Sequence, residues 1–295
     1  MKRGYIYILL TALAFSTMEV VGKTIANQLN PLQLNFLRFL IGGLILLPFG
    51  ISELRTRKVT LMADDFAFFA LTGFLGIVFS MSLFQTAIVY AKASEVAVIV
   101  STNPVFTVPF AYLILKEKLP NNAVLALVLC LVGLGFFLNP FGMRSDLRGI
   151  WLAILSAVSF SLYGVISRTR VEKYGSFALN SLTFLVACAM LLVYLSVRDI
   201  PTFTGITSRN IMQVAYMGVV VTGLGYLFYF LAMKETSAVT AATVFFIKPA
   251  LAPILSLIFL REALKVNTVL GIIFVLAGSF ILLQGKARAA RLTEA

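Results

Sequence analysis

The feature that most constrains the fold is a series of long apolar segments, each about as long as a membrane is thick. A transmembrane helix needs about 20 mainly apolar residues, because the hydrocarbon core is about 30 Å thick. Ten segments meet this length, near residues 4–26, 31–51, 66–90, 94–115, 122–140, 149–168, 176–197, 210–233, 237–260 and 267–284. They are continuously apolar, whereas membrane β-strands alternate. The pattern therefore predicts an all-α integral membrane protein with ten transmembrane helices.

The composition agrees with this prediction and excludes several kinds of chemistry. Apolar residues make up 60% of the chain and charged residues only 12%, whereas soluble domains carry about a quarter charged residues. Histidine is absent, which removes the commonest general base and zinc ligand. The two cysteines, Cys130 and Cys188, lie inside apolar segments. We therefore expect no catalytic residues, no metal site, no cofactor and no disulfide framework.

The distribution of Lys and Arg predicts the orientation in the membrane. The formal net charge is +12, which in a membrane protein is first a topology signal and does not indicate a nucleic-acid partner. Loops on the side of the N-terminus hold 14 of these residues and the opposite loops hold 8. We therefore expect a multi-pass protein of the plasma membrane with both termini in the cytoplasm. The basic tail is expected to contact anionic membrane lipids.

The sequence aligns with itself, without gaps, at an offset of 145 residues. The matched pairs include polar residues, Gly and Pro, which apolar composition alone does not produce: Arg3 with Arg148, Ser16 with Ser161, Asn35 with Asn180, Pro104 with Pro249, Glu117 with Glu262 and Gly133 with Gly278. The repeat predicts two five-helix domains, residues 1–145 and 146–295. Because five is odd, the second enters the membrane from the opposite side. Such inverted repeats are typical of secondary transporters that work by alternating access, with the substrate near the midplane.

The repeated motifs resemble those of the EamA family of the drug/metabolite transporter superfamily. They are Phe15-Ser16-Thr17, Lys23, Arg38-Phe39, Pro104 with Lys116-Glu117, Pro249 with Arg261-Glu262, and Gly133 with Gly278. The resemblance covers nearly all of the chain, once per half. It implies a ten-helix carrier for small metabolites, often an exporter, and it does not name a substrate.

Four ionisable side chains lie inside predicted spans, where they are expensive and are functional candidates. Lys248 is near the middle of its span and precedes Pro249, which leaves nearby carbonyls without a donor. It is either a ligand for a substrate carboxylate or phosphate, or one partner of a structural ion pair with Glu19. Glu19 is either a proton carrier that couples transport, or an i,i+4 partner of Lys23, and it is also a candidate for substrate binding. Lys23 and Arg38 are expected to orient helices or to contact anionic headgroups, and Arg38 is also a candidate for substrate binding.

Uncharged residues complete the predicted site. Asn103, Tyr163 and Gln85 are candidates for lining a substrate cavity, and Pro104 and Pro249 are candidates for hinges. The halves differ where the charges lie: Gly164 aligns with Glu19, Thr183 with Arg38 and Asn103 with Lys248.

The leading hypothesis is a secondary carrier that exports a small metabolite, such as an amino acid, with proton exchange at Glu19 as one option. No GxxxxGK[ST] loop is present, so direct use of ATP is not expected. A membrane channel or an intramembrane enzyme is the alternative. Substrate identity, direction, coupling ion and oligomeric state are left open by the sequence.

Overall fold

The computed structural model describes residues 2–116, 122–137, 147–236, 238–241 and 243–294, where all regular secondary structure is helical. Among these residues, seven segments are long and apolar enough to cross a membrane: Arg3–Ile25, Pro31–Thr56, Ala63–Tyr90, Ala93–Leu115, Leu147–Arg168, Ser176–Val197 and Ile211–Glu235. The other predicted spans correspond to three shorter apolar helices, Ala123–Phe137, Ile247–Leu260 and Val266–Leu282. The predicted all-α membrane fold is confirmed, while the number of ten spans stays a prediction.

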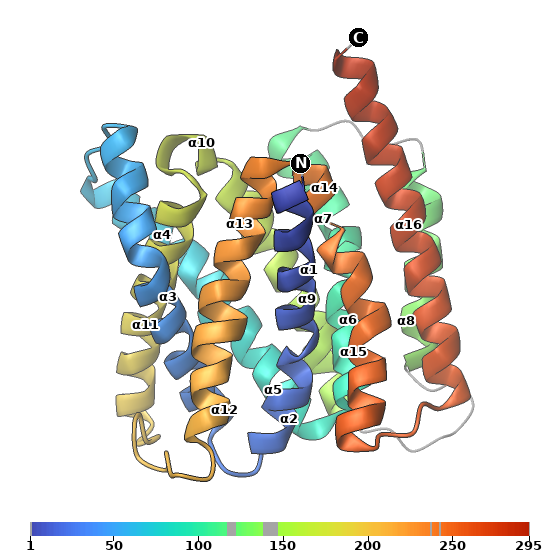
Figure 1. Cartoon of the computed structure of the whole chain (residues 1–295), viewed down its shortest axis with the longest axis horizontal. Helices are drawn as coiled ribbons and strands as arrows, with labels where there is room; N and C mark the ends of the chain where they lie inside the picture. The colour runs from blue at the N-terminus through green and yellow to red at the C-terminus, as the bar shows by residue number, and fades with distance from the viewer. Residues whose placement is uncertain (1, 117–121, 138–146, 237, 242, 295) are drawn as a thin grey trace.

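Four of these seven segments consist of consecutive helices (Figure 1). The first half contains α1 (Lys2–Ser16), α2 (Met18–Ile25), α3 (Pro31–Thr56), α4 (Ala63–Gly73), η1 (Phe74–Met81), α5 (Ser82–Tyr90), α6 (Ala93–Ser101), α7 (Asn103–Phe110), η2 (Ala111–Leu115) and α8 (Ala123–Phe137). The second half contains α9 (Leu147–Arg168), α10 (Val171–Tyr174), α11 (Ser176–Val197), α12 (Ile211–Ala215), η3 (Tyr216–Leu224), α13 (Gly225–Glu235), α14 (Ala238–Ala241), α15 (Val244–Leu260) and α16 (Val266–Glu294).

The first helices of the two halves run in opposite directions. In Figure 1, α1 begins at the end of the bundle where both termini and α10 lie, and it runs toward α2 at the opposite end. Helix α9 leads directly into α10, so it runs toward the end from which α1 departs. We call these the terminal end and the opposite end. The arrangement is that expected for inverted repeats.

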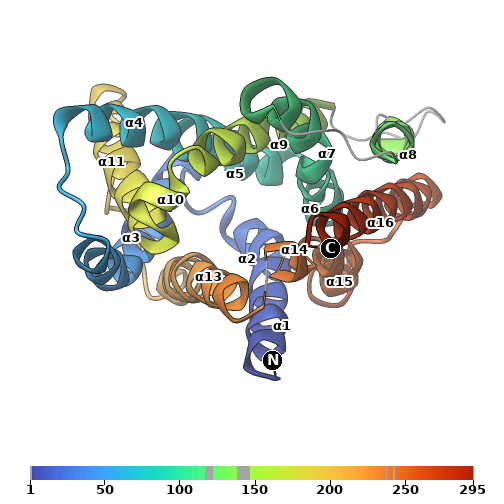
Figure 2. The same ribbon diagram turned by 90° about the horizontal axis from the view of Figure 1, so that it is seen from above.

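Residues related by the repeat also touch each other. Phe39 and Phe184, which are 145 positions apart, pack edge to face with centroids 4.7 Å apart where α3 lies against α11. Cys130 and Val275 are another such pair, and the thiol of Cys130 lies 3.7 Å from the Val275 carbonyl oxygen where α8 packs on α16. Helices α8 and α16 form one edge of the molecule (Figure 2). These contacts define an approximate two-fold axis across the bundle.

The segments Ala63–Tyr90 and Ile211–Glu235 each contain a π-helical stretch, η1 and η3, and the two stretches overlap when the repeats are aligned. A π-helix leaves backbone groups without their usual i→i−4 partner and is frequent at functional sites. The Asn35 side chain donates to the carbonyl of Ile77 in η1 at 2.9 Å. Gly218 in η3 lies so close to Ile41 of α3 that a Cβ would clash. The small residues of this span therefore pack within the chain.

The basic residues of the two repeated motifs, Lys116 and Arg261, lie at the ends of η2 and α15. Lys116 and Arg261 both adopt left-handed backbone angles, φ 56° and φ 54°, and end their helices. Glu117 lies outside the described residues. The Glu262 carboxylate accepts hydrogen bonds from the backbone amides of Ala93 and Ser94 at the start of α6. It thereby connects the second half to the first at the opposite end of the bundle.

The two candidate hinge prolines occupy different backbone settings. Pro104 lies in the first turn of α7, directly after the break between α6 and α7 at Thr102. A first-turn proline removes no helical hydrogen bond. Pro249 lies inside α15, four residues before Pro253. The repeat is therefore preserved in sequence but not in local helix geometry.

Candidate functional site

The first span is interrupted next to its acidic residue. Helix α1 ends at Ser16 and α2 begins at Met18. At the break, the Thr17 hydroxyl lies 2.8 Å from the Ala14 carbonyl oxygen and 2.9 Å from the Tyr216 hydroxyl. Glu19 lies in the first turn of α2, where a carboxylate is favoured by the helix dipole. The break thus directs Glu19 into the bundle.

Glu19 and Lys248 form a buried ion pair between the two halves. Lys248 Nζ lies 2.6 Å from Glu19 Oε1, and the side chains are 5% and 0% exposed. The predicted i,i+4 pair of Glu19 with Lys23 is wrong, because the Lys23 ammonium donates to backbone carbonyls of Ile88 and Ala91, 2.7 Å from each. Lys23 therefore holds α2 against the end of α5. Glu19 Oε2 has no hydrogen-bond donor within the described part of the chain.

Arg38 is buried beside this pair and does not reach lipid headgroups, contrary to the headgroup expectation. Its side chain is among the largest fully buried ones, with 1% exposure. The guanidinium lies over the rings of Phe39 and Phe84, with its carbon 4.6 and 5.7 Å from their centroids. Lys248 Nζ lies 5.8 Å from the Phe84 centroid. One aromatic ring is therefore adjacent to both buried cations.

The polar contacts of Arg38 are weak ones. Nη1 and Nη2 donate to the thioether sulfurs of Met18 and Met81 at 3.0 and 3.1 Å. Nε donates to Asn35 Oδ1 at 3.4 Å. A thioether is a weak acceptor, and cation–π contacts supply part of the missing interaction. In the described residues, no carboxylate oxygen lies within 4.0 Å of this guanidinium.

The remaining predicted residues divide into two groups. Gln85 is 2% exposed, and its Oε1 has no hydrogen-bond donor in the described ranges. Its amide nitrogen faces Gly22 of α2, so Gln85 belongs to the same region as Glu19. Tyr163 donates to Asn180 Oδ1 at 2.9 Å, and the Asn103 carbonyl accepts from the Ser161 hydroxyl at 2.7 Å. Tyr163, which belongs to α9, and Asn103, which accepts from α9, are therefore both hydrogen-bonded within the protein.

Three residues near the cations were not predicted, namely Met18, Met81 and Phe84. In an apolar span such residues look like any other core or lipid-facing residue. Only the spatial arrangement distinguishes them, since each lies against a buried cation. No periodicity in the sequence marks them.

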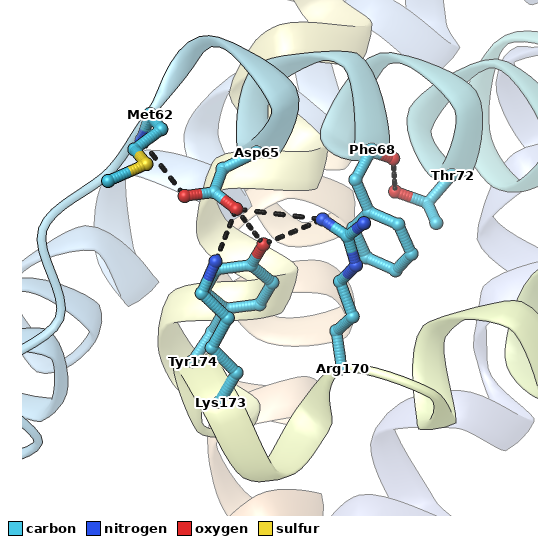
Figure 3. A network of polar contacts seen from close by, with 7 residues as sticks. All are labelled: Met62, Asp65, Phe68, Thr72, Arg170, Lys173 and Tyr174. Carbon is cyan, nitrogen blue, oxygen red and sulfur yellow. Dashed lines mark hydrogen bonds and ion pairs between the residues drawn. The ribbon is translucent and has the colours of Figure 1, made fainter.

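A second cluster of charges joins the halves at the terminal end (Figure 3). Asp65 in α4 accepts from Lys173 and Tyr174 of α10 and from the Met62 backbone amide, and Arg170 lies 3.5 Å from it. Its side chain is 2% exposed, whereas those of Arg170 and Lys173 are 39% and 46% exposed. The hydrogen bond to Asp65 raises the pKa of the Lys173 ammonium. This carboxylate is saturated with donors and lies next to solvent.

Comparison with known proteins places the chain among transporters. The model of the EamA-like transporter family matches residues 2–139 and again residues 147–284. An uncharacterized transporter of Clostridium kluyveri is 45% identical over 289 residues, which cover 95% of this chain and 93% of that protein. The uncharacterized transporter YoaV of Bacillus subtilis is 22% identical over 265 residues, 89% of this chain and 90% of its own length.

A solved structure supports the fold. It superimposes with a TM-score of 0.66, covers 95% of this chain and 96% of its own, and is 18% identical in sequence. The family and the names of the relatives point to a transporter rather than an enzyme. The resemblance inferred from the repeated motifs is confirmed. The chain therefore belongs to the EamA-like transporter family, with one family repeat in each half.

Proposed function

We propose that the protein is a secondary transporter that exports small metabolites, such as amino acids or related compounds, across the plasma membrane. In this proposal ten spans cross the membrane, both termini are cytoplasmic, and the two halves, residues 1–145 and 146–295, rock about the central site. The observation that carries the proposal is the Glu19–Lys248 ion pair, which is buried and joins α2 of one half to α15 of the other. A charge pair at the moving interface links the state of the site to the relative position of the halves.

The charged and polar residues at the centre have distinct proposed roles. Lys248 and Arg38 attract an acidic group of the substrate. The buried Oε1 of Gln85, which has no donor among the described residues, accepts a hydrogen bond from the substrate. Tyr163 and Asn103 contribute from the α9 side, and Pro104 and Pro249 are the proposed hinges.

Glu19 is the proposed coupling residue. While Glu19 is ionised, it holds Lys248, and Lys248 is then less available to a substrate anion. Protonation removes the negative charge, weakens the ion pair and frees the ammonium for the substrate. Binding of a proton and of the substrate would then favour the same state, so the proton and the substrate would leave together, driven by the outward gradient of the substrate.

The experiment that tests this proposal compares cells that overexpress the intact protein with cells that overexpress Lys248→Ala. Metabolites inside and outside are profiled by mass spectrometry. We expect at least one compound to accumulate outside only with the intact protein. Lys234→Ala, which changes an exposed lysine, is the matched control and should behave like the intact protein. Equal export by Lys248→Ala would remove Lys248 from the site, and no exported compound with any variant would contradict the export function.

Counterflow separates a carrier from a channel. Vesicles loaded with the compound found above are diluted into a trace of labelled compound. A carrier accumulates label transiently, because it exchanges molecules one for one, and the initial rate saturates. A channel only equilibrates the label. Absence of transient accumulation would therefore favour the channel alternative.

A further inference from the structure

The centre of the bundle contains more positive than negative charge. Arg38 and Lys248 are 1% and 4% exposed, and the Glu19 carboxylate beside them is fully buried. The ion pair with Lys248 uses this carboxylate at 2.6 Å. Arg38 is left with two thioether sulfurs, an amide oxygen 3.4 Å away and two aromatic faces. One positive charge at the centre thus lacks a counter-charge among the described residues.

A buried charge without a counter-charge lowers the stability of the folded protein. Burial of an ionised group away from a partner costs several kcal/mol, and an apolar residue of similar volume commonly increases stability at such a position. The repeat itself offers an uncharged solution. At the position equivalent to Arg38 the second half has Thr183, which shares a hydrogen bond with Thr72. The fold therefore does not require an arginine here.

The two methionines occupy the donor edge of the guanidinium, where a carboxylate would bind. Nη1 and Nη2 each point to one sulfur, 3.0 and 3.1 Å away. A methionine side chain is unbranched and adaptable, so it moves aside at low cost. Met18 directly follows the break between α1 and α2, and Met81 ends η1, so both are attached where the helix changes geometry. A carboxylate with its two oxygens would replace two weak acceptors by strong, bidentate ones.

We propose that Arg38 is the receptor for the acid group of the transported molecule, and that Met18 and Met81 hold the guanidinium while the site is empty. The inference rests on the transport function proposed above and specifies its substrate class. The substrate is a carboxylic acid that carries one net negative charge, for example a 2-oxo acid or an acidic amino acid. Its charge cancels the excess positive charge at the centre. The rings of Phe39 and Phe84, which lie against the guanidinium, would border the rest of the molecule.

The first test needs no ligand. Thermal unfolding of the purified full-length protein is compared with that of Arg38→Met, in detergent and without substrate. If Arg38 is kept for binding, Arg38→Met removes an uncompensated charge and raises Tm by about 2–4 °C. Arg55→Gln, a change at an exposed arginine, should leave Tm unchanged. A lower Tm for Arg38→Met would mean that Arg38 serves the fold and would overturn the inference.

The second test identifies the exported compounds. Untargeted profiling of the medium compares the intact protein, Arg38→Lys, Arg38→Met and Arg55→Gln. We expect the exported compounds to be monoanionic carboxylic acids, to be lost with Arg38→Met and to fall at least about tenfold with Arg38→Lys, because lysine lacks the planar fork. Exported compounds that are neutral or cationic would overturn the inference and leave the transport function standing. If the intact protein exports nothing, the transport function is contradicted, and the substrate class with it. A higher Tm of Arg38→Met would then show only that Arg38 lowers the stability of the protein.

Discussion

Two clusters of charged residues join the halves of this protein, and they are built on opposite principles. At the terminal end, the single carboxylate of Asp65 is surrounded by donors from Met62, Arg170, Lys173 and Tyr174. At the centre there are two cations and one carboxylate. The carboxylate of Glu19 pairs with Lys248, and Arg38 contacts thioether sulfurs and aromatic rings. The carboxylate of the terminal cluster is saturated with donors and lies next to solvent, whereas the central cluster is buried and has more positive than negative charge.

The difference separates the two reasons for keeping charges in a membrane protein. A saturated network rigidifies the elements it joins, and its loss affects stability first. A buried charge without a full partner lowers stability and is retained where it binds something or changes its protonation state. Mutations at the centre should therefore abolish or uncouple transport, whereas mutations in the terminal cluster should change stability alone, which gives the comparison its tests.

The largest effect is expected from removing one member of the central pair. Lys248→Met leaves the Glu19 carboxylate buried without a partner, which should cost about 3–5 kcal/mol of unfolding free energy and abolish export. Adding Glu19→Leu removes the remaining charge and should restore most of the stability, with no return of export. Denaturant unfolding and export assays measure the two properties. A double variant as unstable as Lys248→Met alone would show that the pair contributes packing rather than charge compensation.

The next largest effect concerns coupling and leaves binding in place. Glu19→Gln mimics the protonated carboxyl, so Lys248 is permanently free for the substrate. We expect substrate accumulation driven by the pH difference to be lost, while exchange of substrate across vesicle membranes stays within about twofold of the intact protein. The measurements are accumulation against a gradient and counterflow, both in vesicles with a set pH difference. Unchanged accumulation in Glu19→Gln would exclude Glu19 as the proton carrier.

In the terminal cluster, a mutation should lower the stability and leave export unchanged. Asp65→Asn removes the charge that Lys173 and Arg170 face, and it should lower stability by about 1–2 kcal/mol, since these hydrogen bonds are charge-assisted but partly solvated. Export per folded molecule should stay at the level of the intact protein. Asp64→Asn, one residue earlier and exposed, is the matched control and should change neither property. Loss of export in a folded Asp65→Asn protein would make this cluster part of the transport cycle.

The sequence predicted the centre far better than the periphery. The span positions could be recognised from the lengths of the apolar segments, and the repeat from the alignment of the sequence with itself. The charges of Glu19, Arg38 and Lys248 could be recognised because charged residues are rare in apolar segments. The ion pair between Glu19 and Lys248 was one of two interpretations of Lys248. It could not be chosen from spacing, since Lys23 lies at a favourable helical distance from Glu19 and the break at Thr17 is not visible in the sequence.

The Asp65 cluster could not be predicted, because its members lie in loop-adjacent segments where charged residues are ordinary. Asp65 and Lys173 are 108 positions apart, and only the packing of α4 near α10 and α11 brings them together. The environment of Arg38 was hidden for the opposite reason. Methionine and phenylalanine are common in every span, so nothing distinguishes those that contact a guanidinium. Charged residues inside apolar spans can be identified from the sequence of a membrane protein, whereas the residues that contact them can be identified only from the folded structure.

The smallest effect is expected from Lys173→Gln, which removes one exposed donor of the terminal cluster. Lys173 is 46% exposed, so the solvent screens its attraction to Asp65, and Tyr174, Arg170 and Met62 still satisfy the carboxylate. The decrease in Tm should be about half that of Asp65→Asn or less, and high salt should diminish it further.

The dependence on pH provides the control for this last prediction. The hydrogen bond to Asp65 raises the pKa of Lys173 above the usual 10.5, so the folded state holds this proton more tightly than the unfolded state. While Asp65 is ionised, the contribution of the Lys173 ammonium is therefore complete below pH 10.5 and disappears as the pH rises through the raised pKa. Intact protein and Lys173→Gln should differ in Tm at pH 7 and converge above that range. A difference that persists there would show that the lysine acts through its aliphatic stem and not through its charge.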